Sequence, residues 1–169
     1  MNHTQKQFRI LAIALSARGL SFAVMEGEDS LVAWGGKQAE GDKNAQALAK
    51  AEKLLDLYKP GILVLQDMEA KGSHRYPRMK RLNRQIIKAA GTRKIKVTLI
   101  SGERQRSLLL GDTNGTKHEM AEMLAQRFPV ELGSRLPAKR REWESESSRM
   151  GIFDAAALAV AFRMRGIRH

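Results

Sequence analysis

One short run, Ile62–Leu65, constrains the fold of this chain more than any other feature. It contains only apolar residues, follows the helix-ending Lys59-Pro60-Gly61 and is too short to be a helix. A continuous apolar strand of this kind is typical of parallel sheets, in which both faces are covered. Helical spacing of apolar residues occurs before it, over Asn44–Tyr58, and after it, over Pro77–Ala90. A buried strand between two helices predicts an α/β domain.

The remaining segments predict an antiparallel half for the same sheet. Alternating apolar residues and turn residues indicate further strands over Arg9–Leu15, Leu20–Met25, Leu31–Gly35 and Lys96–Ile100. Further helices are expected over Glu103–Leu110, Thr116–Phe128 and Gly151–Arg165, with residues 130–149 as an exposed connection. Ser101 and Thr116 are typical N-caps, and Gly91 is the expected stop of the helix that begins at Pro77. The first three strands therefore form a meander beside the parallel strands.

Length and composition indicate one basic globular domain. The chain has 169 residues, of which 43% are hydrophobic, so we expect a polar tail over residues 1–8 and a single domain over residues 9–169. It has no cysteine, which excludes disulfides and thiolate metal sites. No signal peptide or membrane span is evident, so a cytoplasmic location and no membrane partner are expected. A net charge of +12 makes nucleic acid the expected partner.

The positive charge is densest around the second predicted helix. Glu69 is the one acidic residue between Met68 and Ile100, whereas basic residues recur through the same stretch. Arginine and lysine at this density are expected to contact phosphates, which positions nucleic acid without reading its sequence. The predicted contact residues here are Lys71, His74, Arg75, Arg78, Lys80, Arg81, Arg84 and Lys88. Those elsewhere are Arg18, Lys117, Lys139, Arg140 and Arg141.

Four segments, in order, carry a resemblance to a known family. They are Ile10–Gly19 (ILAIALSARG) with the nearby Phe22–Val24 (FAV), Lys59–Asp67 (KPGILVLQD), Gly111–Lys117 (GDTNGTK) and Phe153–Ala161 (FDAAALAVA). Together they resemble the RuvC-type Holliday junction resolvases of the ribonuclease H-like superfamily, from about Arg9 to Arg163. The resemblance implies a mixed five-stranded sheet flanked by helices. It also implies DNA recombination and repair as the setting, and a homodimer with Pro77–Ala90 as the candidate interface.

The same resemblance implies chemistry that this chain supports poorly. Members of the family are endodeoxyribonucleases that cut with two Mg²⁺ or Mn²⁺ ions held by four carboxylates. Matching the motifs places Ala14, Gln66, Phe153 and Ala156 at the four acid positions. None of these residues supplies a carboxylate. The acids left nearby are Asp67, Glu69, Asp154 and Glu146, of which Asp67 and Asp154 are candidates for one weak Mg²⁺ site.

Three functions stay open at this point. The leading hypothesis is a structure-selective protein that binds branched or duplex DNA, is impaired in cleavage and needs no cofactor. The second is an active, divergent Mg²⁺- or Mn²⁺-dependent endonuclease that uses Asp67, Asp154 and Glu69 as catalytic residues. The third is a protein-interaction module for which nucleic acid is irrelevant.

Overall fold

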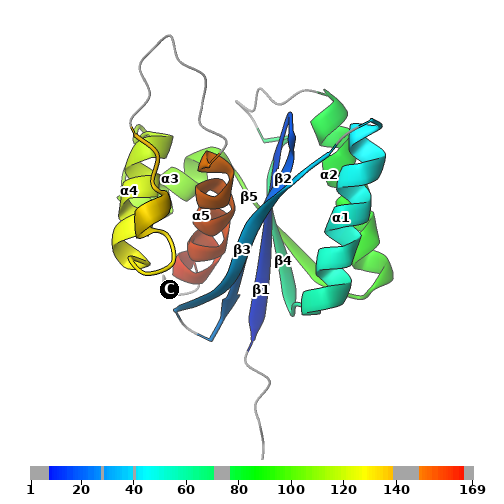
Figure 1. Ribbon diagram of the computed structural model, residues 1–169, viewed down its shortest axis with the longest axis horizontal. Coiled ribbons are helices and arrows are strands. Elements are labelled where there is room, and N and C mark those ends of the chain that lie inside the picture. The colour runs from blue at the N-terminus through cyan, green and yellow to red at the C-terminus, as the bar shows by residue number, and fades with distance from the viewer. Residues whose placement is uncertain (1–7, 28, 40, 71–76, 139–148, 166–169) are drawn as a thin grey trace, which may run out of the picture.

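In the residues that it describes, 8–27, 29–39, 41–70, 77–138 and 149–165, the computed structural model contains five strands and five α-helices. The strands are β1 (Arg9–Ser16), β2 (Gly19–Glu26), β3 (Ser30–Gln38), β4 (Ile62–Gln66) and β5 (Lys96–Ile100). The helices are α1 (Lys43–Tyr58), α2 (Pro77–Thr92), α3 (Gly102–Leu110), α4 (Lys117–Arg127) and α5 (Met150–Arg165), and a short 3-10 helix covers Gly133–Arg135. Figure 1 shows them as a central sheet between two layers of helices.

The strands form one mixed sheet in the order β3-β2-β1-β4-β5. The first three pair antiparallel, while β4 pairs parallel with β1 on one side and with β5 on the other. Leu11 stands opposite Leu63 in the β1–β4 pair, and both side chains are fully buried. The predicted α/β class, the mixed five-stranded sheet and the antiparallel meander are confirmed.

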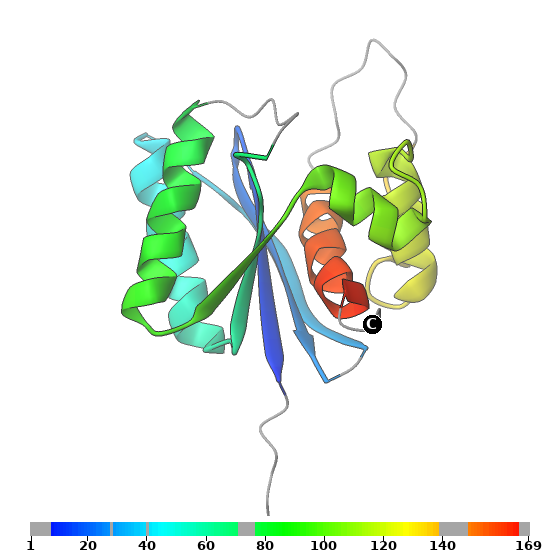
Figure 2. The ribbon, with the colours of Figure 1, turned by 180° about the vertical axis from the view of Figure 1, so that it is seen from behind.

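Helices cover both faces of the sheet, as the apolar run in β4 predicted. Leu11 and Leu63 pack with α1 and α2 on one face, whereas Ala12 and Val64 pack with α3, α4 and α5 on the other. Figures 1 and 2 show the two layers from opposite sides. Because side chains alternate along a strand, each face of β1 and β4 has its own core.

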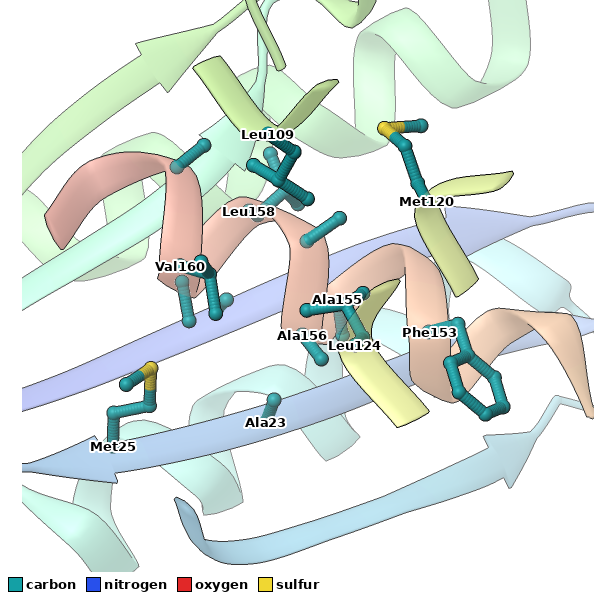
Figure 3. Close-up of a cluster of buried hydrophobic side chains, with 14 of the residues drawn as sticks. Ala23, Met25, Leu109, Met120, Leu124, Phe153, Ala155, Ala156, Leu158 and Val160 are labelled. Atoms are coloured by element: carbon teal, nitrogen blue, oxygen red, sulfur yellow. The ribbon is translucent and has the colours of Figure 1, made fainter. Parts of the chain in front are cut away.

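Helix α5 packs closely on the sheet because its contact residues are small. Ala155 and Ala156 are fully buried, and a Cβ on Gly151 would lie 2.1 Å from the Oγ of Ser21 in β2. Figure 3 shows the alanines and Phe153 of α5 among side chains of β2, α3 and α4. Although α5 is apolar, neither it nor any other helix within the described ranges has the length and hydropathy to span a membrane.

The predicted helix starts are confirmed, but one predicted stop and one predicted loop are wrong. The hydroxyls of Ser101 and Thr116 accept hydrogen bonds from the backbone N–H groups of residues 104 and 119. Helix α2 continues past Gly91 to Thr92, and Lys94 takes the left-handed conformation instead. Residues 130–149 are not exposed throughout, because Leu132 is fully buried in the core under α4 and α5. The apolar residues of this segment follow neither a helical nor a strand period, so the sequence did not indicate that Leu132 is buried.

The N-terminal ends of the helices gather at one edge of the sheet. Strands β1 and β4 end at this edge. Here Lys43, at the start of α1, donates from Nζ to the Ala17 carbonyl at 3.3 Å, and Gly151, near the start of α5, packs against the Ser21 side chain. At the opposite edge, Arg9 donates to the carbonyl of Tyr58, the last residue of α1. Helix N-termini carry partial positive charge, so this edge, called the carboxyl edge below, is suited to anions.

Candidate nucleic-acid interface

The four positions that the resemblance assigns to metal-binding acids all lie on the α5 side of the sheet. Ala14 in β1 is partly buried against the core beneath α5, and its partner across the hairpin is Ser21. Gln66 ends β4 on the same face, since it alternates with Leu65, which packs on the α1 and α2 side. Phe153 and Ala156 are buried in α5, at 2% and 0% exposure. Apolar packing therefore occupies much of this layer.

These residues do not fit a two-metal centre. Two dications about 3.5–4 Å apart repel each other and need several fixed carboxylates. Ala14, Phe153 and Ala156 have no ligand atom in their side chains, and Gln66 offers one neutral amide oxygen. Within the residues that the structure describes, no group of three or more His, Cys, Asp or Glu side chains is arranged to hold a metal ion.

Those of the remaining acids that the structure describes are engaged with neighbouring groups, and Glu69 and Asp154 lie on different sides of the sheet. Asp154 in α5 lies 3.6 Å from the Nζ of Lys117 at the start of α4. Asp67 accepts a hydrogen bond from the Glu69 backbone N–H at 3.1 Å, in the turn after β4. The Glu69 carboxylate pairs with Arg84 of α2, on the far side of the sheet from α5. The structure therefore does not bring Glu69 to Asp154, and the weak Mg²⁺ site at Asp67 and Asp154 stays a prediction.

The Glu69–Arg84 ion pair perturbs both partners. The hydrogen bond from the Arg84 guanidinium lowers the pKa of the Glu69 carboxyl, and the same contact raises the pKa of Arg84. Glu69 is therefore a charged partner of α2 at neutral pH. A group held in this state is a poor general acid.

Helix α2 presents a basic stripe to solvent. Arg81, Arg84 and Lys88 are exposed, and their spacing places them on one face of the helix. Lys80 is half-buried, and Arg78 donates from Nη1 to the Asn44 side chain of α1 at 2.9 Å. The stripe thus begins near the carboxyl edge and runs down α2.

The other predicted contact residues are placed as follows. Arg18 is exposed in the β1–β2 turn, at the carboxyl edge. Lys117 starts α4 and pairs with Asp154. Lys43 was not predicted, yet its contact with the same turn adds another cation to this edge. Lys71, His74, Arg75, Lys139, Arg140 and Arg141 lie outside the described residues, as does Glu146.

Sequence reasoning also missed Arg106, whose guanidinium approaches Gly102, as the Gln66 amide does. A Cβ built on Gly102 would lie 3.4 Å from Nη1 of Arg106 and 3.7 Å from Nε2 of Gln66. The Arg106 Nε donates to the Thr113 carbonyl at 2.8 Å, which fixes the guanidinium. The parallel register that sets Gln66 against Ile100 brings the start of α3 to this point. The sequence signal was an arginine four residues after a helix-starting glycine.

Asn83 holds the end of β4 from the other face. It is 5% exposed, and its Nδ2 donates to the Gln66 carbonyl at 3.1 Å. Its Oδ1 is buried without a hydrogen-bond partner. Helix α2 is thus linked directly to the backbone of Gln66 at the end of β4.

Comparison with known proteins identifies the fold. No protein-family model matches the sequence, and no curated protein sequence matches it. The structure superposes on Thermus thermophilus RuvC with a TM-score of 0.71 at 14% identity, covering 95% of this chain and 96% of that one. RuvC from the same organism in complex with a Holliday junction substrate gives 0.68 at 13% identity, with 95% of each chain covered.

A third structure extends the comparison beyond bacteria. The yeast mitochondrial Holliday junction resolvase Ydc2 gives a TM-score of 0.58 at 15% identity, covering 94% of this chain and 78% of that one. Structural similarity at such low sequence identity establishes the architecture alone, so the activity has to be argued from the residues. The chain therefore has the RuvC-like variant of the ribonuclease H-like fold.

Proposed function

We propose that this protein binds branched or duplex DNA and does not cut it by a two-metal mechanism. The observation that carries the proposal is the apolar layer under α5. Where the resemblance calls for acids, Phe153 and Ala156 are buried as core residues. Ala14 has no ligand atom, and Gln66 is neutral at every accessible pH. A cluster that must hold two dications cannot be assembled from these side chains.

The charge distribution supports binding of a polyanion in the absence of such a cluster. The net charge is +12, and exposed Arg18 stands at the carboxyl edge, where the helix N-termini also lie. The basic stripe of Arg81, Arg84 and Lys88 extends this positive surface along α2. Contacts of this kind are made to the phosphate backbone, so selectivity would come from the shape of the nucleic acid.

The basic stripe on α2 also opposes a homodimer through this helix. A symmetric dimer through the exposed face of α2 would bring two copies of Arg81, Arg84 and Lys88 together. Of these three, only Arg84 has a carboxylate partner among the described residues. We therefore assign this face to DNA, and expect any homodimer to use another surface.

Binding and cleavage can be measured on the same substrates. A labelled four-way junction, a duplex and a single strand are titrated with protein in EDTA between about 50 and 200 mM salt. We expect measurable binding that weakens steeply with salt and prefers the junction. Addition of Mg²⁺ or Mn²⁺ should produce no cleavage. Cleavage that disappears in Asp154→Ala would establish the divergent endonuclease instead.

A matched pair of variants locates the interface. Arg81→Gln removes one charge from the basic stripe, while Lys96→Gln removes one from an exposed residue at the start of β5, at the opposite edge. Loss of a phosphate contact makes the logarithmic salt dependence shallower by about 0.9. We expect this change for Arg81→Gln only. No binding of any DNA at low salt would favour a protein-interaction module.

A further inference from the structure

Strand β5 leaves one edge of the sheet open. It is the last strand in the sheet order, and among the described strands it pairs with β4 alone. In Figure 2 it is drawn in front of the other strands, and no helix crosses it. The Asp67 N–H donates to the Ile100 carbonyl at 3.0 Å, so the backbone groups of Ile100 and of Thr98, two residues earlier, face β4. The N–H and C=O groups of Val97 and Leu99, which alternate with them, therefore point to the free edge.

This edge lacks the features that usually prevent a further strand from pairing. In the described part of the chain, no hydrogen bond joins the outward backbone groups of Val97 and Leu99 to another segment. The opposite edge strand, β3, has a bulge in its pairing with β2 and a lysine, Lys37, within the strand. Strand β5 keeps a continuous register from Lys96 to Ile100, and its residues after Lys96 are uncharged. Bulges and charges protect an edge, so β5 is the more accessible of the two.

The side chains beside the edge form an apolar strip on the α2 face of the sheet. Val97 is partly buried in the core under α2, together with Ile87 and Ile95. Leu99 lies on the same face, because it alternates with Ile100 of the opposite core, and it is 42% exposed. An apolar side chain on an added strand would pack against Leu99 and remove it from water.

Positive charge flanks the apolar strip. Residues 77–100, which form α2 and β5, contain no acidic residue. Lys94 and Lys96 are exposed, and neither makes an ion pair within the described residues. A second copy of the chain paired along this edge would bring the two basic α2 helices to the same face of a joint sheet, since α2 packs on β5. That arrangement is repulsive, whereas a strand with carboxylates is attracted.

We propose that the free edge of β5 is a docking site for an extended, acidic peptide segment of a partner protein. The segment adds a sixth strand and pairs with the backbone of Val97 and Leu99. Its apolar side chains lie on the α2 face against Leu99, and its carboxylates lie on the other face near Lys96. The proposal adds a protein partner to the chain and does not depend on DNA binding.

The first test uses a blocked heptapeptide that alternates glutamate and valine. It is titrated into the full-length, isotope-labelled protein to about 1 mM, a concentration at which weak binding is detected. We expect the backbone amide signals of Val97 and Leu99 to shift, and the same peptide with lysine in place of glutamate to bind at least about tenfold more weakly. No shift at these two amides, or equal binding of the two peptides, would overturn the proposal.

Methylated peptides separate strand pairing from general attraction to a basic surface. Adjacent residues of a strand direct their N–H groups to opposite sides. N-methylation of one alternate set of residues should therefore abolish binding, while methylation of the other set leaves it within about twofold of the parent peptide. Charge and composition are equal in the two methylated peptides. Equal loss in both, or loss in neither, would contradict a strand added at this edge.

Variants of the protein locate the site. The Leu99 N–H faces away from β4, so Leu99→Pro removes no hydrogen bond of the sheet, and it should weaken binding of the acidic peptide by about tenfold or more. Lys96→Gln should weaken the peptide by about two- to fivefold and leave junction binding unchanged, whereas Arg81→Gln should do the reverse. Equal effects of Lys96→Gln and Arg81→Gln on the peptide would refute the site.

Self-association is the competing use of this edge. Sedimentation velocity of the wild-type protein and of Leu99→Pro measures it directly. We expect the same oligomeric state for both proteins. A wild-type dimer that Leu99→Pro dissociates would show that a second copy occupies the edge, and the peptide proposal would fail even if DNA binding were confirmed. If DNA binding fails but the peptide results hold, only the proposed function is lost.

Discussion

The close approach of α5 to β2 gives a sharp prediction about stability. Gly151 is the second residue of α5, and a Cβ there would lie 2.1 Å from Oγ and 3.1 Å from Cβ of Ser21. Gly91 is the second-last residue of α2, and a Cβ there would meet nothing within 4 Å. Alanine at the two positions therefore tests the same backbone change with and without a steric clash.

The magnitudes follow from two opposing effects. Replacing a helical glycine by alanine stabilises by up to about 1 kcal/mol, and about half of that is expected near a helix end. Forcing an extra methyl group into a packed layer costs about 1–3 kcal/mol. Gly91→Ala should thus raise the free energy of unfolding by about 0.5 kcal/mol. Gly151→Ala should lower it by about 0.5–2.5 kcal/mol, or roughly 1–10 °C in melting temperature.

Urea unfolding followed by circular dichroism measures both values. Adding Ser21→Ala to Gly151→Ala removes the hydroxyl that clashes, so the double variant should recover part of the loss. The Cβ of residue 21 remains at 3.1 Å, so recovery should be incomplete. Equal stability changes in Gly151→Ala and Gly91→Ala would show that α5 does not lie against β2 as described.

Three further predictions concern the turn between β1 and β2, the core under α5 and the loss of stability at acid pH. Gly19→Ala should destabilise by at least about 2 kcal/mol in urea unfolding, because its φ is +149° and a Cβ would lie 2.1 Å from the Lys37 carbonyl oxygen. Phe153→Ala should cost about 3–5 kcal/mol in the same assay; a loss below about 1 kcal/mol would contradict its burial. The hydrogen bond from Arg93 lowers the pKa of the Asp56 carboxyl in the folded protein. The ionised carboxylate therefore stabilises the fold fully above the pKa of the unfolded chain, near pH 4, and this stabilisation is lost as the pH falls through the lower pKa of the folded protein. The melting temperature of Asp56→Asn should therefore fall less steeply with acid pH than that of wild type. An equally steep fall in the two proteins would refute the role of the Asp56–Arg93 contact.

Much of the fold could be predicted because its signals are local. The apolar run Ile62–Leu65 indicated a strand covered on both faces, and helices α1 and α2 cover one face while α3, α4 and α5 cover the other. The caps at Ser101 and Thr116 depend on one hydroxyl and a nearby N–H, so the sequence specifies them directly. Gly91 misled because a glycine marks a helix end only when the chain needs a left-handed residue there. Lys94 takes that conformation instead.

The candidate site was predicted less completely because it depends on contacts between distant segments. The exposed basic residues of α2 were visible from charge density alone. Arg106 was not, since its place near the end of β4 arises from the parallel pairing that sets β5 and α3 beside Gln66. Nor did the sequence show that Glu69 turns toward Arg84 and away from Asp154. Helix spacing identifies which residues share a face, but not which opposite charge each will meet.

The burial of Phe153 has a consequence for the history of this protein. A globular domain is stable by only about 5–15 kcal/mol. Exchanging the Phe153 ring for a carboxylate would forfeit its packing, worth about 3–5 kcal/mol, before any other acid was in place to share a cation. Evolution from the present sequence towards a carboxylate cluster, one substitution at a time, would thus pass through poorly folded intermediates. Under the proposed function, the buried aromatic ring therefore makes it energetically unfavourable to build a metal-dependent centre at this position by single substitutions.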